Sequence, residues 1–94
     1  MKADEFAAIT RRVIQSQGFA EFAPTACFPE RRDIRTLAGV PYDEDHASIA
    51  TDWAADLAMP NEEHLVAFKH SSSQFKIVRC VAGQCEHHIY PVEA

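Results

Sequence analysis

The first stretch of the chain repeats its apolar residues with the period of an α-helix. Phe6, Ile9 and Val13 recur at steps of three and four, which places them on one face of a helix over residues 2–17. Gly18 follows as a C-cap, because glycine accepts the left-handed backbone that commonly ends a helix. We therefore predict an amphipathic N-terminal helix whose apolar face packs against the core.

Towards the C-terminus the pattern changes to a period of two, which is typical of β-strands. Three apolar-rich runs occupy residues 64–70, 74–81 and 84–90, joined by short polar turns. The first run is apolar at consecutive positions, which predicts a central strand covered on both faces. Short connections between consecutive strands favour an antiparallel meander. A possible fourth strand near residues 25–28 is placed at an edge of this sheet.

Residues 82–83 are predicted to form the tight turn of a β-hairpin, because the glycine of this pair supplies the backbone freedom that the turn needs. With both residues at the centre of the turn, Cys80 lies opposite Cys85. Phe75 lies opposite Tyr90 and closes the far end of the hairpin. A slip by one residue would reverse the faces of one strand, so these pairs test the register.

A second amphipathic helix is predicted over residues 43–57, where Ile49, Trp53 and Leu57 recur at steps of four. Residues 29–38 begin with a proline, which suits the first position of a helix. We expect this segment to form a short helix or helical turn between the predicted edge strand and the second main helix.

These elements predict an α+β fold in a single domain over residues 1–94. The two main helices are expected to pack on one face of a small antiparallel sheet. The residues expected at this interface are Phe6, Val13, Trp53 and Leu57 from the helices, and Leu65 or Phe68, Ile77 and Ile89 from the strands.

The charges are unevenly distributed along the chain, whose formal net charge is −5. This negative balance disfavours a general affinity for nucleic acid or for anionic membranes. Between Leu37 and Phe68 there is no Lys or Arg, and three aspartates form a row on the predicted second helix. We predict an acidic surface that binds a basic protein partner. Its partner-binding residues are Asp45, Asp52, Asp56, Glu62 and Glu63.

A small basic cluster of Arg31, Arg32 and Arg35 precedes the acidic stretch. These arginines could bind an anion, or they could pair with the acidic row inside the same chain. In the second case the row is satisfied without a separate partner. Both alternatives remain open from the sequence.

Metal or redox chemistry is confined to a few cysteines and histidines. Cys80, Cys85 and His87 share one face of the predicted hairpin, and a fourth ligand from elsewhere would complete a zinc site. The spacing Cys-x4-Cys differs from the usual Cys-x2-Cys. We therefore expect no cofactor, with the two cysteines adjacent, reduced and metal-free, and we keep zinc as the alternative. Cys27 is expected to be a buried thiol rather than a nucleophile.

Sequence motifs of common enzymes are lacking. There is no phosphate-binding glycine loop, HExxH or GxSxG, and no basic, aromatic-rich stretch that favours nucleic acid. There is also no long apolar run for a membrane span and no apolar segment of a secretory signal, which predicts a cytoplasmic protein. The leading hypothesis is a small non-catalytic interaction protein of the inhibitor, immunity or adaptor type. The alternative hypothesis is a small zinc-binding module.

Overall fold

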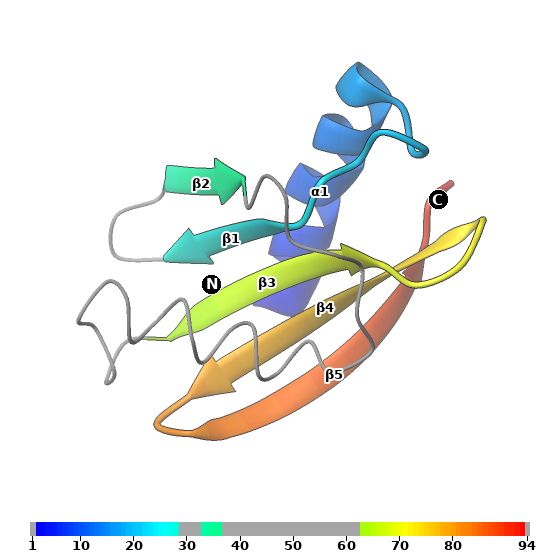
Figure 1. Cartoon of the computed structure of the whole chain (residues 1–94). Helices are drawn as coiled ribbons and strands as arrows, with labels where there is room; N and C mark the ends of the chain where they lie inside the picture. The colour runs from blue at the N-terminus through cyan, green and yellow to red at the C-terminus, as the bar shows by residue number, and fades with distance from the viewer. Residues whose placement is uncertain (1, 29–32, 37–62, 94) are drawn as a thin grey trace.

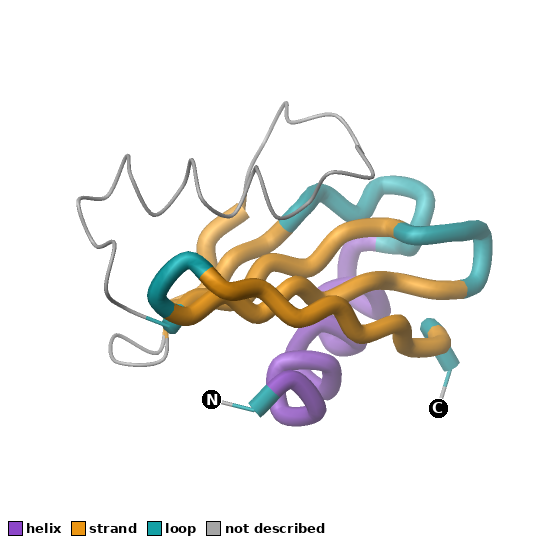
Figure 2. Tube along the Cα trace, turned by 90° about the horizontal axis from the view of Figure 1, so that it is seen from below, coloured by secondary structure: helices purple, strands orange, loops and turns teal. Residues whose placement is uncertain are grey.

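A computed structural model of the chain describes residues 2–28, 33–36 and 63–93, and within them the fold is α+β. One face of a five-stranded antiparallel sheet, with strand order β2-β1-β3-β4-β5, is crossed by a helix (Figures 1 and 2). The elements are α1 (Ala3–Gln17), β1 (Thr25–Phe28), β2 (Asp33–Thr36), β3 (His64–Lys69), β4 (Gln74–Val81) and β5 (Gln84–Pro91).

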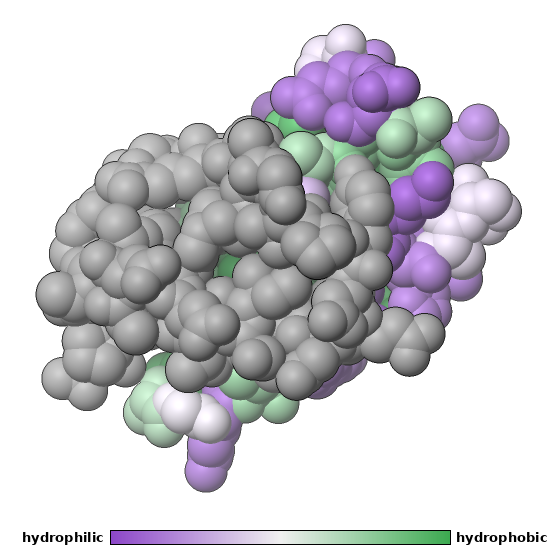
Figure 3. Space-filling view, viewed as in Figure 1, coloured by the Kyte–Doolittle hydropathy of each residue, from purple (hydrophilic) through white to green (hydrophobic). Residues whose placement is uncertain are grey.

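Helix α1 agrees closely with the pattern of its sequence. It ends at Gly18, whose φ of 82° lies in the left-handed region and whose N–H donates to the carbonyl of Ile14 at 2.7 Å. Asp4 and Glu5 lie in the first turn, where the helix dipole favours negative charge. Hydrophilic side chains gather at the C-terminal end of α1 in Figure 3, so this end of the helix faces solvent.

The N-terminal side of the sheet differs from the prediction in two ways. β1 is not an edge strand, because it pairs with β2 on one side and with β3 on the other. Residues 33–36, expected to be helical, form β2, in which Ile34 is the register partner of Cys27. A segment of four residues is too short to show a clear hydrophobic period. β2 is extended because the backbone groups of β1 are available to pair with it.

The predicted second helix over residues 43–57 lies outside the described residues, so the arrangement of two helices on one face is not confirmed. Trp53 lies outside them as well. The same holds for four of the predicted partner-binding residues: Asp45, Asp52, Asp56 and Glu62.

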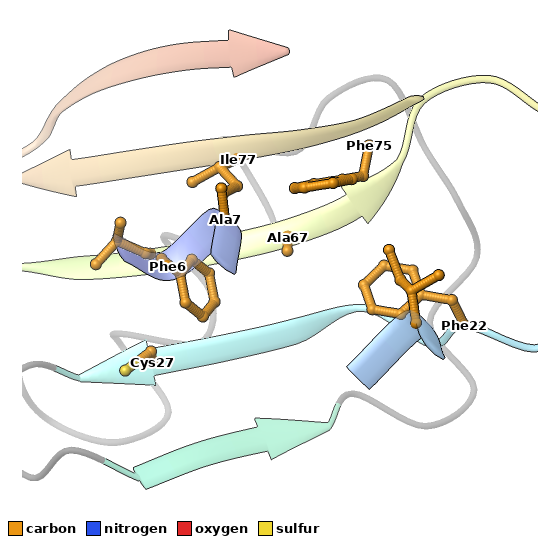
Figure 4. Close-up of a cluster of buried hydrophobic side chains, with 9 residues drawn as sticks. Phe6, Ala7, Phe22, Cys27, Ala67, Phe75 and Ile77 are labelled. Carbon is orange, nitrogen blue, oxygen red and sulfur yellow. The ribbon is translucent and has the colours of Figure 1, made fainter. Parts of the chain in front are cut away.

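The core between α1 and the sheet contains the predicted residues Phe6, Leu65 and Ile77, none of which is exposed. Ile89 was expected there, but its side chain is 50% exposed. It is the register partner of Lys76 and therefore projects from the face opposite α1. Figure 4 shows this core in close-up; its buried members are Phe6, Ala7, Ile14, Phe22, Cys27, Leu65, Ala67, Phe75 and Ile77.

The opposite face of the sheet carries a second buried cluster, which supports the prediction that β3 is a central strand. Val66 and Phe68 project from β3 on this face, whereas Leu65 and Ala67 project towards α1. All four side chains are fully buried. The members of the second cluster are Ala26, Val66, Phe68, Val78 and Cys80, with Cys85 packed against them.

The predicted register of the C-terminal hairpin is confirmed. Cys80 lies opposite Cys85, and Phe75 lies opposite Tyr90 with the two ring centroids 5.6 Å apart. The turn between the strands has positive φ at both central residues, 51° at Ala82 and 81° at Gly83. This backbone matches the right-handed twist of the strands and allows a two-residue connection.

Candidate interaction surface

Strand β5 is joined to the first turn of α1 by a tyrosine and a carboxylate. The hydroxyl of Tyr90 donates a hydrogen bond to Oδ1 of Asp4 at 2.7 Å. Burial of the phenol, followed by the hydrogen bond and the negative charge of Asp4, raises the pKa of Tyr90 to about 12. The contact links residues far apart in the sequence and fixes β5 against the helix.

Arg11 closes the end of the same strand. Its guanidinium lies over the rings of Phe75 and Tyr90, 5.6 and 5.9 Å from their centroids. Its Nε donates to the carbonyl oxygen of Pro91 at 3.1 Å. The last carbonyl of β5 therefore has a partner within the chain.

A row of ionic side chains continues from these residues along the α1 side of β4 and β5. Arg79 forms ion pairs with Glu63 and, at 3.4 Å, with Glu86. Nε2 of His88 lies 3.1 Å from a carboxylate oxygen of Glu86. Burial opposes ionisation of Glu63, but cationic neighbours that include Arg79 outweigh it and lower the pKa of this carboxyl.

This ionic row borders a shallow hollow of about 280 Å³. At its rim Glu86 pairs with Arg79 and lies beside His88, and Asp4 accepts the hydrogen bond from Tyr90. Such mutual pairing is typical of a structural surface rather than of an activated acid or base. Its lining residues are Lys2, Ala3, Asp4, Arg79, Glu86, His88 and Tyr90.

The two hairpin cysteines form a disulfide, so the expectation of a reduced pair is wrong. The sulfur atoms of Cys80 and Cys85 are 2.04 Å apart. Facing positions on neighbouring strands bring the two thiols within bonding reach, and this proximity is the physical reason that they form a bond instead of remaining reduced. A disulfide is more common in oxidising compartments, and the cytoplasmic location therefore remains a prediction.

The disulfide also changes the zinc hypothesis. Zinc binds thiolates, so Cys80 and Cys85 can serve as ligands only after reduction. His87 shares their face of the sheet and is exposed. Within residues 2–28, 33–36 and 63–93, no group of three or more potential ligands is arranged to hold a metal ion. The zinc site of Cys80, Cys85 and His87 stays an untested prediction.

The remaining candidate residues from the sequence lie in different elements or outside the described residues. Glu63 is the one predicted partner-binding residue within the described part, and its side chain is 21% exposed beside Arg79. Arg35 lies in β2 opposite Ala26, whereas the other two arginines of the basic cluster lie outside the described residues. The thiol of Cys27 is 1% exposed in the core, which does not suit a nucleophile that must meet a substrate.

The outer edge of β5 is a feature that sequence reasoning did not identify as a site. β5 is the last strand in the sheet order, so its outer backbone groups have no ladder partner in the described sheet. The Cα atoms of Cys80 and Cys85 are only 4.1 Å apart, which is typical of a pair without mutual backbone hydrogen bonds. The N–H and C=O groups of Cys85 therefore point away from β4.

The period of two extends this orientation along β5. The backbone groups of His87 and Ile89 also point outwards, and Pro91 follows at the next such position. Proline has no N–H, and the Pro91 carbonyl already accepts the bond from Arg11. Among the described residues, the edge is thus closed at Pro91 and open over residues 85–89. A proline at the end of the last strand was the signal in the sequence.

No family model, curated protein or solved structure matches the chain. No helix in the described part of the chain has the length and apolar character needed to cross a membrane. The function is therefore inferred from the residues and surfaces of this chain alone.

The contact between Tyr90 and Asp4 predicts a displaced titration. In a Tyr42→Phe background, the absorbance at 295 nm should report ionisation of Tyr90 near pH 12 rather than near the ordinary value of about 10. Because the folded pKa is raised, the stability contributed by this contact is fully present below about pH 10. It is lost as the pH rises through about 12.

Asp4→Asn should lower the pKa of Tyr90, since it removes the negative charge beside the phenol. Glu5→Gln removes the same charge from the same helical turn and serves as the control, because Glu5 is exposed. Titration of Tyr90 near pH 10 in the folded protein would contradict the contact.

Proposed function

We propose that this chain is a small non-catalytic protein-interaction module, of the inhibitor, immunity or adaptor type, that presents an acidic segment to a basic protein partner. The observation that carries the proposal is that the negative excess of the chain lies outside the described residues, which we call the scaffold. The described residues contain equal numbers of basic and acidic side chains, if histidine is left aside. Residues 37–62 contain no Lys or Arg, and they carry the negative excess of the chain.

The balance of basic and acidic side chains in the scaffold supports this assignment. Within it, Glu86 forms an ion pair with Arg79, and Nε2 of His88 lies 3.1 Å from a Glu86 oxygen. Such pairing is typical of a stable surface, because opposite charges that alternate on a surface cost little free energy. An unbroken run of like charge is unfavourable for a helix by itself, and it is better explained by cations that a partner supplies. The proposed contacts are Asp45, Asp52, Asp56, Glu62 and Glu63.

The proposal implies a particular kind of binding. Opposite charges steer association and raise its rate more than they strengthen the final complex. Exposed charges are screened over about 8 Å at physiological ionic strength, so affinity should fall as salt is added. The competing possibility is that Arg31, Arg32 and Arg35 of the same chain neutralise the acidic row.

Charge reversal separates these two possibilities. Asp52→Lys combined with Asp56→Lys should weaken partner binding at least about tenfold, mainly through slower association, while the unfolding temperature stays near that of wild type. The measurement is capture from an extract of the native host with quantitative mass spectrometry, followed by kinetics with the purified partner at low and high salt. The matched control is Glu21→Lys combined with Glu93→Lys, which reverses two exposed acids of the scaffold.

Two outcomes would contradict the proposal. A double variant that binds the captured protein as tightly as wild type would show that the acidic row is not the contact. A double variant that is strongly destabilised, beside a control that is not, would show that the chain's own arginines already pair with the row.

A further inference from the structure

We infer that the edge of β5 is a homodimer interface, at which β5 pairs antiparallel with β5 of a second copy about a two-fold axis through His87. This inference is independent of the acidic segment and rests on the backbone and side chains of one described strand. Its starting point is the open edge over residues 85–89, whose outward backbone groups belong to Cys85, His87 and Ile89.

An antiparallel register centred on His87 satisfies all of these groups at once. His87 then faces His87 of the second copy, and Cys85 faces Ile89 of the second copy in both directions. Each facing pair joins two residues whose backbone groups point towards each other, so each forms two hydrogen bonds. Pro91 falls opposite the turn residue Gly83, where its missing N–H leaves no gap in the paired segment.

The side chains on the α1 side of β5 complement themselves in this register. Glu86 lies directly opposite His88 of the second copy, and His88 lies opposite Glu86 of the second copy. Within one chain, Nε2 of His88 is already 3.1 Å from a Glu86 oxygen. The dimer therefore builds one alternating cluster of carboxylates and imidazoles, with opposite-type pairs across the strands.

The neighbouring registers lack this complementarity. Centring the axis on residue 86 places Glu86 opposite itself, which is destabilising for like charges. Centring it on residue 88 removes the pairing of Glu86 with His88 of the second copy and brings Pro91 opposite Cys85, where one backbone hydrogen bond is lost. Of these three registers, the one centred on His87 is favoured, because it avoids the Glu86–Glu86 pair and keeps Pro91 out of the paired segment.

Exposed apolar surface points to the same register. Among the described residues, Ile89 is the large hydrophobic residue that is exposed to solvent, with half of its surface accessible. In the dimer it faces the disulfide of the second copy, because Cys85 lies opposite it. Pairing across β5 would thus cover both the open backbone and the isolated apolar side chain of this edge.

Sedimentation equilibrium of the oxidised chain tests the dimer. The weight-average mass should rise from 10.5 kDa towards twice that value as concentration increases. Ile89→Lys places a charge on the strand edge that pairs with the second copy. His87→Pro removes an outward N–H and leaves the backbone hydrogen bonds between β4 and β5 in place. Each should raise the dissociation constant at least tenfold. Ala8→Lys adds the same charge to an exposed position of α1 and should change nothing.

A spin label at Gln84→Cys tests the register. Gln84 lies opposite residue 90 of the second copy, so two labels should be about 20 Å apart at about 3.4 Å per residue. The registers centred on residues 86 and 88 give about 14 and about 27 Å by the same rise. A chain that stays monomeric at all concentrations, a dimer that Ile89→Lys leaves intact, or a label distance other than about 20 Å would each overturn the inference.

Discussion

Phe6→Ala is expected to lower the free energy of unfolding by about 3–5 kcal/mol, the loss typical of a buried phenylalanine. Phe6 is completely buried, and it packs between α1 and the sheet beside Leu65 and Ile77. A domain of this size is stable by only about 5–15 kcal/mol, so the substitution removes a large share of its stability. Urea denaturation followed by circular dichroism measures the change.

Phe19→Ala is the matched control for this substitution. Phe19 is only partly buried at the border of the same core, where the Lys69 ammonium lies 5.2 Å from its ring centroid. The same side chain is removed, but less surface was excluded from water, so the loss should be smaller. Equal losses for Phe6→Ala and Phe19→Ala would show that α1 does not pack on the sheet through Phe6.

Reduction of the disulfide is expected to lower the free energy of unfolding by about 2 kcal/mol, the chain-entropy estimate for so short a loop. Cys80 and Cys85 are separated by five positions, so the loop that the bond closes in the unfolded chain is small. The measurement compares urea denaturation of the wild-type chain with and without a phosphine reductant.

Cys80→Ala combined with Cys85→Ala is the control, because a chain without the bond should not respond to reductant. Equal stability of oxidised and reduced wild type would contradict the expected contribution.

The reduced sample also tests the zinc alternative. Stoichiometric zinc that survives dialysis and is lost in His87→Ala would favour a zinc site of Cys80, Cys85 and His87.

The parts of the fold that sequence reasoning predicted are those with local causes. The step of the apolar residues and Gly18 placed α1 almost to the residue. Alternation on both sides of a two-residue turn predicted the hairpin and its register, because register follows directly from turn length. The opposition of Cys80 and Cys85 was predicted by the same argument, whereas their bonding was not.

β2 and the position of β1 required tertiary information. Four residues carry too little periodicity to distinguish a strand from a helical turn, and β2 exists because β1 offers it a partner. β1 is interior for the same reason, since β3 pairs with it across a separation of about forty residues in the chain. Such pairings depend on which edges meet in space, which no local pattern records.

The sequence by itself determined the N-terminal helix, the hairpin, the apolar character of β3 and the concentration of acidic residues in one segment. Only the tertiary structure decided that β1 is interior and that β2 and β5 are the two edges of the described sheet. Ile89 illustrates the difference. Its apolar character and its place in a strand are visible in the sequence, but its exposure follows from facing away from α1 on a strand with one neighbour. Burial is a property of neighbours, and neighbours are set by the fold.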